Sequence, residues 1–132
     1  MPGGRLRENV YFLMLRALNL YQSSYLPKQE ALGTSISEAR AIILLSDSPE
    51  LFADGIPQFA NAPQSEVIEI LKNLSDRGWL VQAGNGYTLT DKGQIKAEQL
   101  WALADTHEGI IFKDLSDAEM TSYKHILRNV GS

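Results

Sequence analysis

The feature that most limits the possible folds is a hairpin signal inside a chain whose other segments read as helices. The β-prone runs 79–83 and 87–89 flank the residues Gly84-Asn85-Gly86. An Asn-Gly pair between two such runs favours a tight two-residue turn, because both turn positions need a positive φ. The sequence therefore predicts a mainly α fold with one small two-stranded β wing.

Four helical segments and one turn are predicted before the hairpin. Apolar residues at Leu6, Val10, Leu13, Ala17 and Leu20 predict a helix from 6 to about 24, which we expect to end at Leu26-Pro27 because a residue before proline avoids helical angles. The other segments are a helix over 36–46 after a capping box at Ser35 and Glu38, a turn opened by Ser48-Pro49, a short helix over 56–60, and a helix that begins near Asn61-Ala62-Pro63 and stops at Gly78.

Two helices are predicted after the hairpin. Thr90 caps a long helix that runs to about 113, and a second capping box at Ser116 and Glu119 starts the last helix. The spacing of the last helix predicts that Met120, Tyr123, Ile126, Leu127 and Val130 face inward. The first helix and these two carry apolar spacing typical of helices that pack along other helices.

Composition narrows the classes of protein. The chain has 132 residues, which suits one domain, and a formal net charge of −4, which argues against a polybasic surface for nonspecific binding to DNA or lipid. It has no cysteine, so disulfide frameworks, thiolate zinc sites and cysteine nucleophiles are excluded. The apolar stretch 10–15 is too short to span a membrane and no signal peptide is apparent, so we expect a cytoplasmic protein.

A helix followed by a wing is an arrangement that reads DNA. An α-helix fits the major groove, and a hairpin beside it can reach the neighbouring backbone or minor groove. Two copies that meet through their outer helices would place two such helices about one turn of DNA apart. The pattern thus favours a DNA-binding homodimer.

Four segments resemble the MarR family of winged-helix regulators. They are Leu44-Leu45-Ser46, Val67–Leu74 with the following Ser75–Val81, Leu89-Thr90-Asp91-Lys92-Gly93, and Leu115–Glu119. The resemblance implies one domain over 1–132, with a winged-helix DNA-binding portion at 35–93 and helical dimerisation portions at 5–26 and 94–130. It also implies an obligate dimer, a palindromic operator and a small-molecule effector pocket between the two portions.

The residues expected to carry these functions fall into two sets. The DNA-binding set is Asn61, Gln64, Ser65, Ile68, Lys72, Arg77, Asn85 and Gly86. The ligand-binding set is Tyr11, Tyr21 and Trp101, with Tyr25 as a further aromatic residue; packing between helices is the alternative role for these side chains.

The chain departs from the family where DNA would be contacted. The family's reading helix usually begins with an Arg-Ser-Thr-like run, whereas here the matching residues are Gln64-Ser65-Glu66, and the wing lacks a long charged tip. Between 56 and 93 the chain has three basic residues and four acidic ones, which gives this segment a net charge of −1. The basic residues are Lys72, Arg77 and Lys92, and the acidic ones are Glu66, Glu69, Asp76 and Asp91. Two hypotheses follow: a regulator that contacts few phosphates, or a winged-helix protein that has lost DNA binding and acts through protein contacts.

Catalytic and metal sites are not expected. His107 lies near Asp105 and Glu108, but consecutive helical positions point in different directions, so we expect His107 at a dimer seam or on the surface and not as a metal ligand. No nucleophile elbow or phosphate-binding loop frames a serine or a lysine. We therefore expect no enzyme activity and no cofactor.

Overall fold

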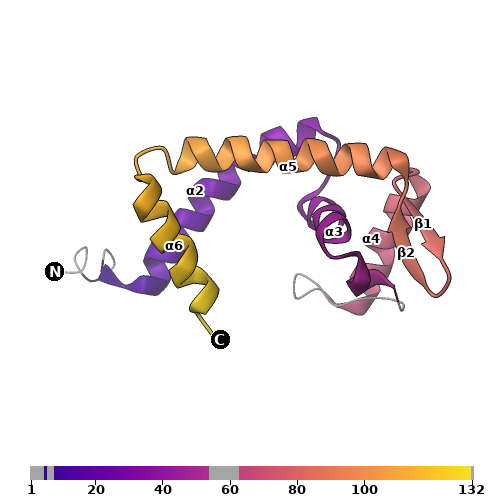
Figure 1. Ribbon diagram of the computed structural model, residues 1–132, viewed down its shortest axis with the longest axis horizontal. Coiled ribbons are helices and arrows are strands. Elements are labelled where there is room, and N and C mark those ends of the chain that lie inside the picture. The colour runs from indigo at the N-terminus through magenta and orange to yellow at the C-terminus, as the bar shows by residue number, and fades with distance from the viewer. Residues whose placement is uncertain (1–4, 6–7, 54–62, 132) are drawn as a thin grey trace.

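A computed structural model describes residues 5, 8–53 and 63–131. In chain order these residues form α2 (Val10–Ala31), α3 (Ile36–Asp47), the 3-10 turn η1 (Pro49–Phe52), α4 (Gln64–Asp76), β1 (Leu80–Ala83), β2 (Gly86–Leu89), α5 (Asp91–Ile111) and α6 (Asp117–Asn129). Figure 1 shows α5 as one long helix, with α3, α4 and the hairpin at one end and α6 at the other. The predicted mainly α fold with a two-stranded wing is confirmed.

The buried core lies at the winged end of the molecule. Its members come from α3, η1, α4, the hairpin and the first half of α5: Ala39, Ala41, Ile42, Leu45, Phe52, Val67, Ile70, Leu71, Leu74, Trp79, Leu80, Leu89, Ala97 and Leu100. Each helix contributes the apolar stripe that its 3.6-residue period creates. This cluster holds α4 and the wing in a fixed relation.

The wing is a tight antiparallel hairpin. Leu80 pairs with Leu89 and Ala83 pairs with Gly86. The two turn residues are therefore Gly84 and Asn85, and Gly84 has a φ of +59°. The predicted hairpin is confirmed, but its turn lies one residue earlier than the Asn85-Gly86 pair implied.

The segment that joins the wing to α5 needs a glycine. Thr90 caps α5: its hydroxyl accepts from the Gly93 N–H at 3.1 Å and donates to the Gly78 carbonyl at 2.6 Å. This places Gly93 directly against the backbone of Trp79, and a Cβ on Gly93 would collide with the Trp79 carbonyl oxygen. Thr90 and Gly93, at the start of α5, therefore contact Gly78 and Trp79, which directly precede the wing.

Proline does not end the first long helix, so that prediction is wrong. α2 continues through Pro27 to Ala31. The turn beyond the proline is held by tertiary contacts: Gln29 is buried and exchanges hydrogen bonds with Thr34, and the Lys96 ammonium donates to the Leu32 carbonyl at 2.9 Å. These contacts offset the hydrogen bond that proline removes from a helix.

The outer helices expose the residues that were expected to face inward. Within the described part of the chain, no residue of α6 is buried, and Ile126 and Val130 are 59% and 68% exposed. On α2, Val10 and Leu20 are 67% and 53% exposed. The inward orientation predicted for the last helix is therefore wrong for Ile126, Leu127 and Val130 in a single chain, whereas Met120 and Tyr123 are half-buried.

The remaining boundaries agree closely with expectation. Both capping boxes form, at Ser35 with Glu38 and at Ser116 with Glu119. Pro63 flanks the first turn of α4, while the predicted helix at 56–60 and the capping residue Asn61 lie outside the described residues. Among the residues described, no helix has the length and apolar character to cross a lipid bilayer.

Two glycines of α5 provide a matched test of the wing contact. We expect Gly93→Ala to lower the free energy of unfolding by about 1–3 kcal/mol, because the added methyl group must displace the backbone of Trp79. Gly109→Ala, where nothing lies within 4 Å, should be neutral or stabilise the helix by up to about 1 kcal/mol. Chemical denaturation at one protein concentration measures both. Equal effects of the two substitutions would contradict the proposed contact.

Candidate functional site

The helix α4 has one buried face and one exposed face, and the exposed face carries most of the residues predicted to contact DNA. Val67, Ile70, Leu71 and Leu74 pack into the core. The predicted contact residues Gln64, Ser65, Ile68 and Lys72 are all exposed, as is Glu69. The sequence prediction of which side of this helix faces outward therefore agrees with the structure.

Arg77 is exposed, and two contacts hold its side chain against the protein surface. Its guanidinium donates to the Glu38 carboxylate at 3.3 Å and lies 4.0 Å from the centre of the Trp79 ring. Glu38 also caps α3, through the Ser35 N–H at 2.9 Å. Arg77 was predicted as a DNA contact, and its salt bridge and cation–π contact both hold it at the C-terminal end of α4.

Two lysines at the same end bind backbone carbonyls. The Lys92 ammonium donates to the Arg77 carbonyl at 3.2 Å. Lys96, which donates to Leu32, also lies 5.3 Å from the Trp79 ring. These cations join α4, α5 and the α2–α3 connection around Trp79.

The charge left on the exposed face of α4 is mainly negative. The helix carries Glu66, Glu69 and Asp76 against the single cation Lys72. Phosphate neutralisation by cations supplies most nonspecific affinity for DNA. The excess of negative charge seen in the sequence therefore remains on α4, and the exposed cations Arg77 and Lys92 lie beyond the C-terminal end of the helix.

The two wing residues predicted to bind DNA differ in their surroundings. Asn85 is exposed at the turn. Gly86 is buried, and a Cβ there would collide with the carbonyl oxygens of Phe52 and Ala53. Close packing of the wing on η1 explains why position 86 is glycine, which corrects the expectation that it lies at an open tip.

A cavity of about 240 Å³ lies between α2, α3 and α5. Its walls are mostly apolar and aromatic, with Tyr21, Tyr25, Ile36 and Ile43 among them, and Arg40 is the only charged residue in its lining. Such a pocket, apolar with a few polar groups, is typical of small-ligand sites. The sequence analysis did not single out Arg40.

The three predicted ligand residues are not brought together. Tyr21 lines this cavity, whereas Tyr11 is 61% exposed and packs edge-on against Phe12, and Trp101 is 39% exposed. Neither Tyr11 nor Trp101 lines any of the three cavities described here. Burial, followed by the charges of Tyr25, Glu108 and Asp105, raises the pKa of Tyr21 above its ordinary value, so this phenol stays neutral at physiological pH.

Behind Tyr21, a buried histidine joins α2 to α5. The His107 ring meets the Tyr21 ring edge-on at 4.6 Å between centroids. Its Nε2 lies 3.0 Å from the Tyr21 carbonyl and 3.2 Å from the Ser24 hydroxyl, and its Nδ1 lies 3.3 Å from the Lys28 ammonium. The expectation that His107 lies at a dimer seam or on the surface is wrong, because its ring is fully buried between α2 and α5 of a single chain. The described residues contain no group of three or more possible metal-binding side chains.

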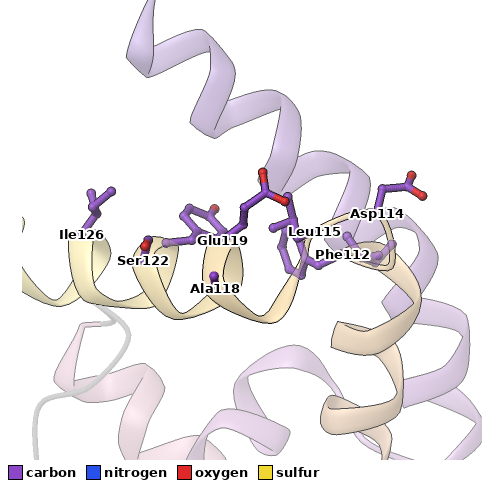
Figure 2. A pocket seen from close by; sticks show the side chains of 9 residues that line it. Phe112, Asp114, Leu115, Ala118, Glu119, Ser122 and Ile126 are labelled. Carbon is purple, nitrogen blue, oxygen red and sulfur yellow. The ribbon is translucent and has the colours of Figure 1, made fainter.

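A larger apolar groove, of about 710 Å³, lies at the corner between α5 and α6. Figure 2 shows Phe112, Leu115, Ala118 and Ile126 along this corner, together with the carboxylates of Asp114 and Glu119. A further cavity of about 410 Å³ separates α6 from α2, beside a Glu108–Lys124 salt bridge of 3.1 Å. The α6 helix thus leaves apolar surface open on two sides.

With this geometry established, comparison with known proteins defines the class. No protein-family model matches the sequence. The fold is similar to that of the Mycobacterium tuberculosis MarR family protein Rv2887 in complex with DNA, with a TM-score of 0.80 and 19% identity over 94% of this chain and 98% of that one. The same protein in complex with p-aminosalicylic acid gives a TM-score of 0.77 and 20% identity over 94% and 99%.

Two other regulators have the same architecture. The MarR family transcriptional regulator SPO1453 from Silicibacter pomeroyi DSS-3 gives a TM-score of 0.78 and 24% identity over 95% of this chain and 94% of that one. CouR from Rhodococcus jostii RHA1, bound to p-coumaroyl-CoA, gives 0.76 and 17% identity over 95% and 93%. The protein is thus a winged-helix protein, and its particular fold is that of the MarR-type regulators.

Proposed function

We propose that this chain is a DNA-binding transcriptional regulator of the MarR type and not an enzyme. The observation that carries the proposal is the exposed face of α4, held by the core beside a tight wing, in a fold that matches a DNA-bound regulator over nearly its full length. The α4 helix enters the major groove through Gln64, Ser65, Ile68 and Lys72, and the wing approaches the adjacent backbone through Asn85.

We propose further that the protein acts as a homodimer. Apolar side chains on α2 and α6 are exposed in one chain, and the groove beside α6 is open. A second copy would cover this surface, so residues 5–26 and 94–130 are assigned to dimerisation and residues 35–93 to DNA binding. Two α4 helices in such a dimer would read a palindromic or nearly palindromic operator.

A small organic acid is the proposed effector. The cavity beside Tyr21 is mostly apolar, with Arg40 as the charged residue of its lining, and similar folds include complexes with p-aminosalicylic acid and with p-coumaroyl-CoA. A guanidinium at an apolar pocket favours a carboxylate attached to a flat hydrocarbon ring. The contact from Tyr21 to His107 would pass a change in the cavity to α5, which carries the wing.

A second candidate function is supported by the charge of the α4 face. Glu66, Glu69 and Asp76 outnumber Lys72, and Arg77 is engaged with Glu38. A face of this sign suits a basic protein surface better than phosphates. In this alternative the chain antagonises another regulator through protein contacts and does not bind DNA.

Salt dependence of duplex binding separates the two functions. We expect fluorescence anisotropy to detect binding to random-sequence duplex at about 50 mM salt, with an affinity that falls as salt rises. Glu69→Lys should strengthen binding to this random-sequence duplex, because it replaces a carboxylate with a cation on the face that meets the phosphates. Glu98→Lys, the same charge change at an exposed position of α5, serves as the control and should have a smaller effect. An absence of binding at low salt would favour the protein-contact function.

Salicylate is a suitable probe for the cavity. We expect calorimetry to detect its binding, and Arg40→Gln to weaken that binding about tenfold, because a charge-assisted hydrogen bond to the carboxylate is lost. Lys113→Gln removes a positive charge from an exposed residue outside this cavity and should leave salicylate affinity unchanged. Equal affinities of the wild type and Arg40→Gln would contradict the assigned role of Arg40.

A further inference from the structure

The position of Glu69 on α4 distinguishes it from Glu66, the other glutamate of the helix. Residues three and four positions apart are neighbours on a helix surface, so the neighbours of Glu69 are Ser65, Glu66, Lys72 and Asn73. All four are exposed. Glu69 therefore lies at the centre of the outward face.

Glu66 occupies a different place on the same helix. Its neighbour four positions later is the buried Ile70, whereas the residue four positions after Glu69 is the exposed Asn73. Glu66 therefore lies at the flank of the face, beside the stripe that packs into the core. The two glutamates have the same chemistry, but of the two only Glu69 lies at the centre of the exposed face of α4.

Among the described residues, none is a partner for the carboxylate of Glu69. It forms no hydrogen bond and no ion pair with the described residues. Lys72, one turn further along, lies on the same face and offsets part of its charge. A carboxylate at the centre of a helix that enters the major groove must meet a hydrogen-bond donor there, because any acceptor would repel it.

The base edges of the major groove differ in what they offer a carboxylate. Cytosine presents the N4 amino donor with no acceptor of its own beside it. Adenine presents its N6 donor next to the N7 acceptor, guanine presents two acceptors, and thymine presents an acceptor and a methyl group. An acceptor-only side chain therefore discriminates in favour of cytosine, whereas a glutamine, which both donates and accepts, favours adenine.

We infer that Glu69 sets the base specificity of the protein by accepting a hydrogen bond from the N4 amino group of one cytosine in each half-site. This inference rests on the proposed DNA-binding function, which it makes more specific. It also explains the negative charge on the exposed face of α4. The carboxylate weakens nonspecific binding to phosphates but makes the protein selective for one base pair.

The experiment is selection of duplexes from a random pool by the full-length protein and three variants. The wild type should recover a C·G pair at one fixed position of each half-site. Glu69→Gln should recover A·T at that position, and Glu69→Ala should recover no preferred base there. Glu66→Gln, the matched control at the flank, should keep the wild-type C·G pair. The substituted side chains are exposed, so circular dichroism should report unchanged folding.

Binding measurements on individual duplexes give the strength of the preference for cytosine. Replacing the selected cytosine with adenine should weaken wild-type binding about tenfold or more and strengthen binding by Glu69→Gln. If wild type and Glu69→Gln recover the same base at every position, the inference is wrong while the DNA-binding function stands. If no duplex is enriched by the wild type or any variant, the DNA-binding function itself fails, and the role of Glu69 fails with it.

Discussion

Apolar surface that one chain leaves uncovered is the constraint on which the rest of this structure depends. The winged end has a complete core, whereas α6 buries no residue among those described and α2 exposes several large apolar side chains. Water-exposed apolar surface costs about 25 cal/mol per Å² relative to burial, so faces of this kind favour association. In the proposed dimer a second copy covers the exposed apolar side chains of α2 and α6, so these helices form the interface.

The long helix α5 connects that surface to the reading face. At its start Gly93 packs against Trp79 of the wing, and near its end His107 contacts Tyr21 of α2. One continuous helix carries both contacts (Figure 1), so in the proposed regulator a change in how α2 packs on α5 would be passed along α5 to the wing. The cavity beside Tyr21 lies at this joint, where a bound molecule would have the greatest effect.

Local signals in the sequence predicted most of the fold. Both capping boxes, the hairpin and the helix stop at Gly78 follow from short-range chemistry, and all were found. The helix end predicted at Pro27 is wrong because hydrogen bonds between Gln29 and Thr34, and the long-range bond from Lys96 to the Leu32 carbonyl, hold the turn beyond it. The site was less predictable: exposure of Ser65 and Lys72 follows from helical period, but the engagement of Arg77 with Glu38, thirty-nine residues away, depends on long-range packing that periodicity does not encode.

The mass of the protein in solution tests this account most directly. Size-exclusion chromatography with light scattering should give about twice the 14.7 kDa of one chain at micromolar concentration. Ile126→Glu, which places a carboxylate in the groove beside α6, should shift the protein toward the single-chain mass. A wild-type protein that stays at 14.7 kDa across the concentration range would contradict the central claim, since its apolar helices would then be stable without a second copy.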